Sequence, residues 1–321
     1  MIYIVIFLIL LLLELAYFGI AKRFNIIDKP NERSSHKHIT LRGGGIIFLL
    51  GIWVYSILLG FNYPYFLGGL TLIAIISFID DIYSLSDRIR LVFQFSSILP
   101  MFYQFGILSF DYWWLIIIAW IVCVGIINAY NFMDGINGIT GGYSLSVILP
   151  LIYINYHKNF IDPNLLYIIG ISLVVFCIFN FRKRAKCFAG DVGSVSIAFI
   201  IIFIIGKLIL ATNNISYIML LAIYGVDSVL TICHRIMLHE SLGKAHRKHI
   251  YQLMANELHI PHTTVSAIYA SLQLIISMGL IMLPINSWLY SVLVLIVLCI
   301  YYIAFIKKYY HLHEAYLKER N

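Results

Sequence analysis

Long apolar runs alternate along the chain with short polar segments, and this pattern predicts a bundle of membrane-spanning helices. A transmembrane helix needs about 20 mostly apolar residues. Eleven runs approach this length, and the run at 143–156 is the weakest of them. The sequence therefore predicts an all-α polytopic membrane protein with a single membrane-embedded domain over residues 1–321. The expected spans are 2–21, 44–61, 65–79, 91–106, 112–128, 143–156, 165–181, 195–211, 215–233, 264–283 and 287–306.

The basic residues predict the orientation of these spans. The first run is followed, not preceded, by Lys22 and Arg23, so we expect it to be retained rather than cleaved as a signal peptide, with its N-terminus outside. Eleven spans then place the C-terminus in the cytoplasm. In this arrangement 20 of the 22 Lys and Arg residues fall on the inner side, while Lys158 lies outside and Lys207 lies within a span. Such an asymmetry is typical of the positive-inside rule.

The composition excludes several classes of protein. Hydrophobic residues make up 61% of the 321 positions, charged residues make up 12%, and the mean hydropathy is +0.91. Soluble domains contain about 45–50% and about 25% respectively, so a soluble enzyme and a disordered chain are excluded. The net charge of +7 comes from short loops between apolar runs, which indicates membrane topology rather than nucleic-acid binding. Five cysteines show no paired spacing, so we expect neither a disulfide framework nor a Cys-x-x-Cys metal site.

Carboxylates and amides gather where spans meet the inner face. Asp80 and Asp81 end the third span, where the helix dipole and their mutual repulsion disfavour two negative charges. Asn128, Asn131 and Asp134 leave the fifth span along one side of a helix. Solvated helix ends and a polar turn are the simple interpretations. The alternative is a divalent cation, because carboxylate and amide oxygens suit Mg²⁺, which shares its coordination shell with substrate phosphates.

The glycine-flanked Asp191 opens the eighth span, after a basic run at 182–186. An Asp at this position can be an ordinary helix cap. The neighbouring glycines and basic residues favour instead a phosphate or metal site at the helix N-terminus.

Two basic segments on the inner side could hold phosphate. Arg42 precedes three glycines at a helix start, although glycines in spans often serve packing alone. The longest inner loop contains His246, Arg247 and His249, which could also be a solvated loop. A zinc site is not expected, because His239-Glu240 does not continue as His-Glu-x-x-His. Acidic groups for a metal and basic groups for phosphates together indicate phosphoryl transfer. A transporter would place polar residues near the bilayer midplane on broken helices, whereas most of these spans look uninterrupted.

Motifs between residues 28 and 255 resemble, in order, those of the polyprenyl-phosphate N-acetylhexosamine-1-phosphate transferases, the superfamily of WecA- and MraY-type enzymes. They are the Pro-Asn-Glu-Arg-Ser-Ser-His string at 30–36, Arg-Gly-Gly-Gly at 42–45, Asp80-Asp81 with Leu85, Arg90 and Gln94, the Asn-Phe-Met-Asp-Gly string at 131–135, and Gly-Asp-Val-Gly-Ser at 190–194.

The resemblance implies a reaction. A UDP-N-acetylhexosamine gives its sugar-1-phosphate to undecaprenyl phosphate and releases UMP, with Mg²⁺ required and Mn²⁺ as an alternative. The implied location is the bacterial inner membrane, among membrane lipids, with the active site on the cytoplasmic face. A homodimer is left open. A membrane transporter of lipids or nucleotide sugars and a lipid-pyrophosphate hydrolase are the competing functions.

The resemblance also implies residue roles. Asp191 and Asn131 match metal ligands, and Asp80, Asp81 and Asp134 match catalytic positions. The nucleotide-binding candidates are Asn128 and Asn137, and the phosphate-binding candidates are Arg42, His246, Arg247 and His249.

The last inner loop differs from that of many members, which carry a run of histidines there. It reads Ala-His-Arg-Lys-His-Ile-Tyr-Gln at 245–252, which is similar to the WbpL-type branch that initiates O-antigen or capsule. This argues against a UDP-MurNAc-pentapeptide donor. GlcNAc and a 6-deoxy amino sugar such as FucNAc or QuiNAc both stay open.

Overall fold

The computed structural model describes residues 1–28, 39–108, 113–241 and 246–318, so the motif expected at 30–36 lies outside the described residues. Nearly every described element is a helix, and the one sheet among them is a two-stranded antiparallel hairpin. In chain order the elements are α1 (Ile2–Arg23), β1 (Ile27–Asp28), β2 (Thr40–Leu41), α2 (Ile46–Leu59), α3 (Pro64–Tyr83), α4 (Asp87–Phe105), α5 (Trp113–Met133), α6 (Ile139–Lys158), α7 (Pro163–Asn180), α8 (Gly190–Thr212), η2 (Ile215–Leu221), α9 (Ala222–Met237), α10 (Ile250–Asn256), α11 (His262–Met282) and α12 (Ser287–Lys318).

A helical segment stands at each of the eleven predicted runs, including the weakest one, which falls within α6. In the described parts of the chain, eight helical segments are long and apolar enough to cross a membrane. The chain is therefore an all-α polytopic membrane protein. The eight segments are α1, α3, α5, α7, α8, the stretch formed by η2 and α9, α11 and α12.

Helix α8 forms the centre of the bundle. Its sequence is apolar on every side, and such a helix is stable only when other elements surround it. Most of its residues are buried, and it packs against α2, α3, α5 and α6. Aromatic side chains fill the contact with α3, where the rings of Phe66 and Phe203 stack with centroids 4.0 Å apart. The start of α8 is also inside the protein, since Gly190, Val192 and Gly193 are buried.

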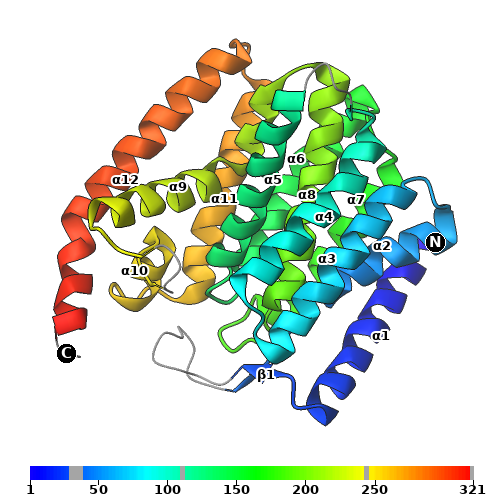
Figure 1. The fold of residues 1–321 in the computed structure, drawn as a ribbon, viewed down its shortest axis with the longest axis horizontal. Helices are drawn as coiled ribbons and strands as arrows, with labels where there is room; N and C mark the ends of the chain where they lie inside the picture. Colours follow the sequence, from blue (N-terminus) through cyan, green and yellow to red (C-terminus); the bar gives the residue numbers. More distant parts are fainter. Residues whose placement is uncertain (29–38, 109–112, 242–245, 319–321) are drawn as a thin grey trace.

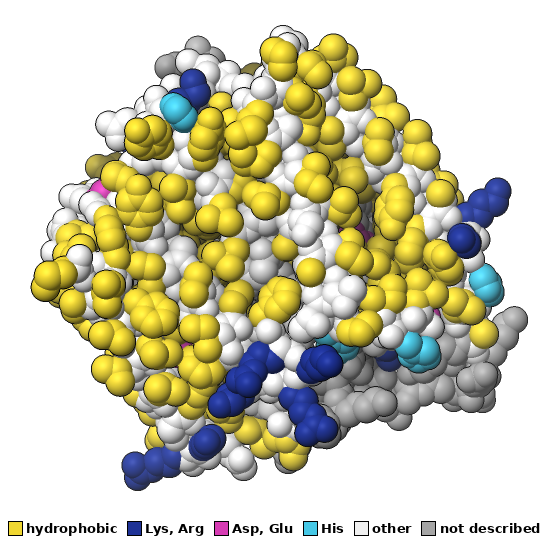
Figure 2. Space-filling model, turned by 180° about the vertical axis from the view of Figure 1, so that it is seen from behind, with side chains coloured by type: hydrophobic (Ala, Val, Ile, Leu, Met, Phe, Trp, Pro, Cys, Tyr) yellow, Lys and Arg dark blue, Asp and Glu magenta, His cyan; other side chains and the backbone are white. Residues whose placement is uncertain are grey.

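The outer surface is apolar, as expected for helices that face lipid. Figure 2 shows hydrophobic side chains over most of one face, with many of its Lys and Arg residues along the lower edge. In Figure 1 the same edge carries β1, α10 and the C-terminal end of α12. Soluble monomers rarely expose a large contiguous apolar surface, so this surface is typical of a membrane protein.

The span predicted at 215–233 lies within the apolar helical stretch Ile215–Met237, and this stretch is broken where η2 meets α9. The chain forms η2 and then α9, which runs across Figure 1 while α6 and α11 run along the bundle. Gln273 of α11 stabilises the break. Its Oε1 accepts hydrogen bonds from the Ile223 N–H (3.1 Å) and the Tyr143 hydroxyl (2.8 Å), and its Nε2 donates to the Met219 carbonyl (3.0 Å). In a bilayer, groups freed by a helix break must find such partners within the protein.

We expect Gln273→Leu to destabilise the protein by about 2–4 kcal/mol, because it leaves several buried polar groups without partners. The thermal unfolding midpoint of the purified protein in detergent measures this loss. The control is Leu272→Met, at a half-exposed neighbouring position. Equal midpoints for the two variants would show that the break does not depend on Gln273.

Candidate active site

The glycine triplet before α2 packs directly against the start of α8. The Gly44 N–H donates to the Phe188 carbonyl (2.8 Å), and the Gly45 N–H donates to the Ala189 carbonyl (3.0 Å). A Cβ on Gly45 would lie 2.2 Å from the Cα of Gly193, so only glycine permits this approach. Two of the triplet's amides are therefore used for packing rather than being available to phosphate.

Asp81, at the end of α3, points at the first turn of α8. Its Oδ1 accepts the Asp191 N–H (2.8 Å) and its Oδ2 accepts the Val192 N–H (3.0 Å). The Arg42 Nε lies 2.6 Å from Oδ1, and the Asp81 side chain has no exposed surface. The second carboxylate of the pair is thus fully engaged by the protein.

Asp80 points elsewhere. Its Oδ1 accepts the backbone N–H of Leu85, and its Oδ2 lies 3.3 Å from the Arg90 Nη1. Adjacent residues near a helix end project in different directions, so the two carboxylates serve different surroundings.

A small cavity collects several predicted residues. Asp80, Asn131 and Asp191 line it from α3, α5 and α8, together with Arg90 and Gln94 of α4. The Asp191 carboxylate lies 3.5 Å from the Arg42 Nη2 and 3.7 Å from the Arg90 Nη1. The remaining lining residues are Ile73, Ile76, Ser77, Phe93 and Val195.

The oxygen donors of this cavity fit a magnesium ion. Asp191 and Asp80 offer carboxylates, and Asn131 offers an amide oxygen that accepts a long hydrogen bond (3.4 Å) from the Ser194 hydroxyl. Within the described ranges, no three His, Cys, Asp or Glu side chains form a metal-binding group. Mg²⁺ is nevertheless commonly held by one or two carboxylates, with waters and substrate phosphates completing its shell.

Of the two predicted nucleotide-binding amides, Asn128 contacts a residue of the cavity lining and Asn137 contacts the segment before α8. Asn128 of α5 donates to Gln94 Oε1 (3.0 Å), and Gln94 is a lining residue. Asn137 is buried and donates to the Arg182 carbonyl (2.9 Å), so it fixes the basic segment before α8. Either amide would need to change partners to contact a nucleotide through its nitrogen.

Asp134 lies in the α5–α6 loop, outside the cavity lining. Its carboxylate accepts a hydrogen bond from the Thr140 hydroxyl. Burial raises the pKa of Asp134 to about 7, although the Thr140 hydrogen bond opposes the shift. The side chain is therefore poised between its neutral and charged forms near pH 7.

The predicted phosphate-binding loop forms a second cluster at the start of α10. His249 is the N-cap of α10, and its Nδ1 lies 3.4 Å from a carboxylate oxygen of Asp227. The rings of His246 and His249 have centroids 5.0 Å apart. Burial and the nearby charges of His249, Arg235 and Lys248 lower the pKa of His246 to about 3, so its imidazole is neutral at pH 7. Arg247 lies between these two histidines in the chain.

Tyr251 connects this basic cluster to the Asp134 loop. The buried Tyr251 hydroxyl donates to the Phe132 carbonyl (2.8 Å), and a Cβ on Gly135 would lie 2.2 Å from the same hydroxyl oxygen. Asp227 accepts the Ile250 N–H (3.1 Å) and thereby fixes the start of α10. We gave neither Tyr251 nor Asp227 a role from the sequence, although Tyr251 lies within the quoted string at 245–252 and its place there was the signal that could have indicated one.

Arg90 and Gln94 belonged to the motif resemblance without a role of their own. Their spacing of four residues places them on one face of α4, which is the signal that could have assigned both to the site.

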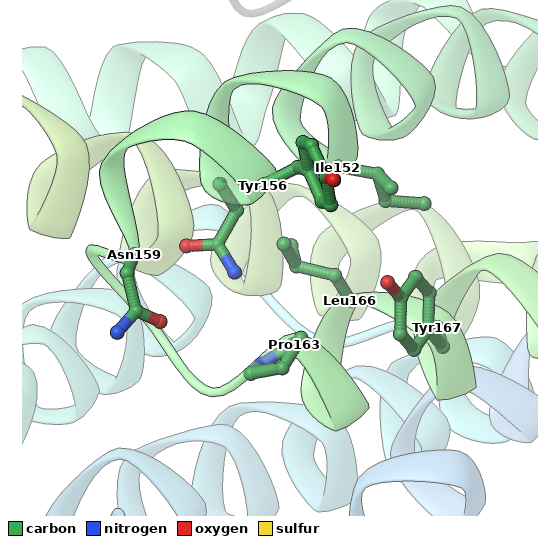
Figure 3. A pocket seen from close by; sticks show the side chains of 7 residues that line it. Ile152, Tyr156, Asn159, Pro163, Leu166 and Tyr167 are labelled. Atoms are coloured by element: carbon green, nitrogen blue, oxygen red, sulfur yellow. The ribbon is translucent and has the colours of Figure 1, made fainter.

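A larger hollow lies at the other end of α6 and is a poor candidate for the chemistry. Figure 3 shows it between the last turns of α6 and the start of α7. Because α6 has 20 residues, its ends are about 30 Å apart, and Asp134 lies near the opposite end. The lining contains no charged side chain and consists of Ile152, Asn155, Tyr156, Asn159, Pro163, Leu166 and Tyr167.

The Asp134 carboxyl predicts a pH dependence of stability. Its pKa is about 7 in the folded protein and close to 4 in an unfolded chain, so the folded state binds more protons between these values. The contribution of Asp134 to the free energy of unfolding is complete below about pH 4 and is lost as the pH rises through 7. As the pH is raised from 5 to 7.5, we expect the thermal unfolding midpoint of the wild type to decrease relative to that of Asp134→Asn. Parallel midpoints across this interval would contradict the assignment.

Known proteins with related sequences were compared with this chain. Residues 63–209 match glycosyl transferase family 4. The chain is 26% identical to the probable undecaprenyl-phosphate N-acetylglucosaminyl 1-phosphate transferase of Bacillus subtilis, over 74% of this chain and 72% of that protein. It is 30% identical to the phospho-N-acetylmuramoyl-pentapeptide-transferase of Thermotoga neapolitana, over 50% and 58%.

A third relative is the undecaprenyl-phosphate alpha-N-acetylglucosaminyl 1-phosphate transferase of Yersinia pestis, which is 25% identical over 73% of this chain and 71% of its own length. The matched segment from 63 to 209 contains the cavity residues of α3, α4, α5 and α8. These matches confirm the resemblance drawn from the motifs: the chain is similar to glycosyl transferase family 4 and to transferases of the WecA and MraY type.

Proposed function

We propose that this protein transfers a sugar-1-phosphate from a UDP-N-acetylhexosamine to undecaprenyl phosphate and releases UMP. The cavity that joins Asp80, Asn131 and Asp191 to Arg90 is the observation that carries this proposal. It combines oxygen donors for a cation with a guanidinium for phosphate oxygens, which are the requirements of phosphoryl transfer. The names of the Bacillus and Yersinia relatives describe the same kind of reaction for those proteins.

In the proposed reaction an oxygen of the lipid phosphate attacks the β-phosphorus of the nucleotide sugar. The bond between this phosphorus and the oxygen that bridges to the α-phosphorus breaks, and UMP leaves with the bonding electron pair. The lipid phosphate is already ionised at pH 7, so the step needs no strong general base. We therefore assign Asp80 to the orientation of Arg90, whose guanidinium can hold the lipid phosphate, and not to proton removal.

Asp191 and Asn131 are the residues that would hold Mg²⁺, or Mn²⁺ in its place, and the bound ion would neutralise charge on the pyrophosphate oxygens. Arg42 and Arg90 lie within 3.7 Å of the Asp191 carboxylate and can hold the phosphates beside it. Arginine suits this task because its planar guanidinium donates two parallel hydrogen bonds to a phosphate.

The other predicted residues complete the binding site in this proposal. Asn128 and Asn137 contact the nucleotide, and Asp134 adjusts the charge of the loop beside it. His246, Arg247 and His249 bind a phosphate, and the neutral His246 can accept a proton as the negative charge arrives.

We further propose eleven crossings with the N-terminus outside and the reaction on the cytoplasmic face of a bacterial inner membrane. The distribution of the basic residues and the position of β1, α10 and the C-terminal end of α12 at one edge support this orientation. The loop at 245–252 supports a role in starting O-antigen or capsule, with GlcNAc, FucNAc or QuiNAc as the sugar.

Release of UMP from the purified protein in detergent tests the proposal. The assay contains undecaprenyl phosphate, Mg²⁺ and a panel of UDP-N-acetylhexosamines, with reactions that lack lipid or contain EDTA as controls. Release that needs both lipid and metal supports the transferase, and the best donor identifies the sugar. UMP without lipid would indicate a hydrolase of the nucleotide sugar. Inorganic phosphate from a lipid pyrophosphate, without any nucleotide, would indicate the hydrolase alternative, and flux across vesicles without UMP would indicate a transporter.

Asp191→Asn should lower the rate of UMP release at least 100-fold, because the change removes a charge that holds the metal against the reacting phosphates. The control is Glu314→Gln, the same chemical change at an exposed position on α12. Both variants should keep the unfolding midpoint of the wild type within a few degrees. Activity of Asp191→Asn near that of the wild type would overturn the metal assignment.

A further inference from the structure

We propose that Asp81 is a positioning residue that fixes Asp191 by capping the first turn of α8 from the neighbouring helix α3. Under this proposal Asp81 does not contact the substrate, and only Asp80 of the pair faces the cavity. The consequence for catalysis rests on the proposed function, whereas the cap itself does not.

The N-terminus of α8 needs a cap that its own sequence does not supply. The first amide N–H groups of a helix have no partner within the helix. The N-cap of α8 is Ala189, and no side chain at that position accepts a hydrogen bond. Both carboxylate oxygens of Asp81 fill this need, at 2.8 Å and 3.0 Å from the amides of Asp191 and Val192. A negative charge at this end also complements the helix dipole.

The surroundings of Asp81 leave no space for another ligand. The Arg42 Nε lies 2.6 Å from Oδ1, and no surface of the side chain is exposed. Gly190 has a φ of +71°, and a Cβ there would lie 2.5 Å from the Asp81 Oδ2 and 2.9 Å from the Gly43 nitrogen. The residue before Asp191 must therefore be glycine for the cap to form.

This arrangement explains how Asp191 comes to face the cavity. In many helices the N-cap side chain accepts the N–H of the second or third residue, and in α8 these two amides belong to Asp191 and Val192. The Asp81 carboxylate already occupies the amides of Asp191 and Val192. The Asp191 carboxylate is consequently available to line the cavity with Asp80 and Asn131.

Hydrogen exchange of the full-length, metal-free protein tests the cap directly. In Asp81→Ala, we expect the peptide that covers the first turn of α8 to exchange at least tenfold faster than in the wild type, because two charge-assisted hydrogen bonds are lost. Asp80→Ala is the matched control and should leave this peptide unchanged. Unchanged exchange in Asp81→Ala would overturn the proposal.

Gly190→Ala disrupts the same cap without changing Asp81. It should reproduce the faster exchange, because its Cβ displaces the Asp81 carboxylate. Gly68→Ala, on the same helix as Asp81, is its control because nothing lies within 4 Å of a Cβ there. If Asp81→Ala does not fold, Asp81→Asn and Gly190→Ala provide the same measurement. Normal exchange in both would overturn the proposal.

Kinetics give the second readout. For Asp81→Asn we expect the Mg²⁺ concentration for half-maximal UMP release to rise at least tenfold, with turnover partly recovered at saturating metal. Asp80→Asn should lower turnover at every Mg²⁺ concentration. A loss in Asp81→Asn that is independent of Mg²⁺ would show that Asp81 acts on the substrate and would overturn the proposal. If the wild type releases no UMP, the proposed function fails, and the exchange measurement still decides the cap.

Discussion

The buried N-terminus of α8 is the constraint on which the inner end of the molecule depends. Helix α8 is surrounded along most of its length, so the polar groups at its start cannot turn to water. Each partner comes from another part of the chain. The Gly44 and Gly45 amides bind carbonyls just before α8, and Asp81 binds amides within its first turn. The candidate site is assembled around this helix end.

Two groups of candidate residues are connected near the α5–α6 loop. The acidic cavity lies among α3, α4, α5 and α8, and the basic cluster lies at the start of α10. Tyr251 joins them through its bond to Phe132. Helix α10 is in turn supported by α12. Glu257, at the end of α10, forms a buried pair with His313 of α12 at 2.8 Å. The Lys248 ammonium, just before α10, lies over the ring of Tyr310 of α12. The last helix thus supports a part of the candidate site from outside the bundle.

The sequence predicted the fold well, because apolar runs of about 20 residues have few alternatives in a membrane. It did not predict the break before α9, since Gln273, which stabilises the break, follows it by some 50 residues. The short helix α10 and the extension of α12 to Lys318 were missed because both lie beyond the apolar runs.

For the site, the sequence predicted that carboxylates from several spans gather at one end of the bundle, and in the structure Asp80, Asp81 and Asp191 lie close together there. It could not assign different surroundings to Asp80 and Asp81, because the Asp81 partners lie 110 residues away in the chain. From the sequence, the glycine triplet could either bind phosphate or serve helix packing. Only the contact between the two backbones distinguishes these interpretations.

That contact between Gly45 and Gly193 has a consequence for how such proteins can diverge. In most packed pairs a larger residue on one side is accommodated by a smaller residue on the other. Here the approach of the two backbones already requires that both side chains be absent, so no smaller residue remains to compensate. The two positions are far apart in the chain, yet neither glycine can be substituted in a descendant that keeps this geometry.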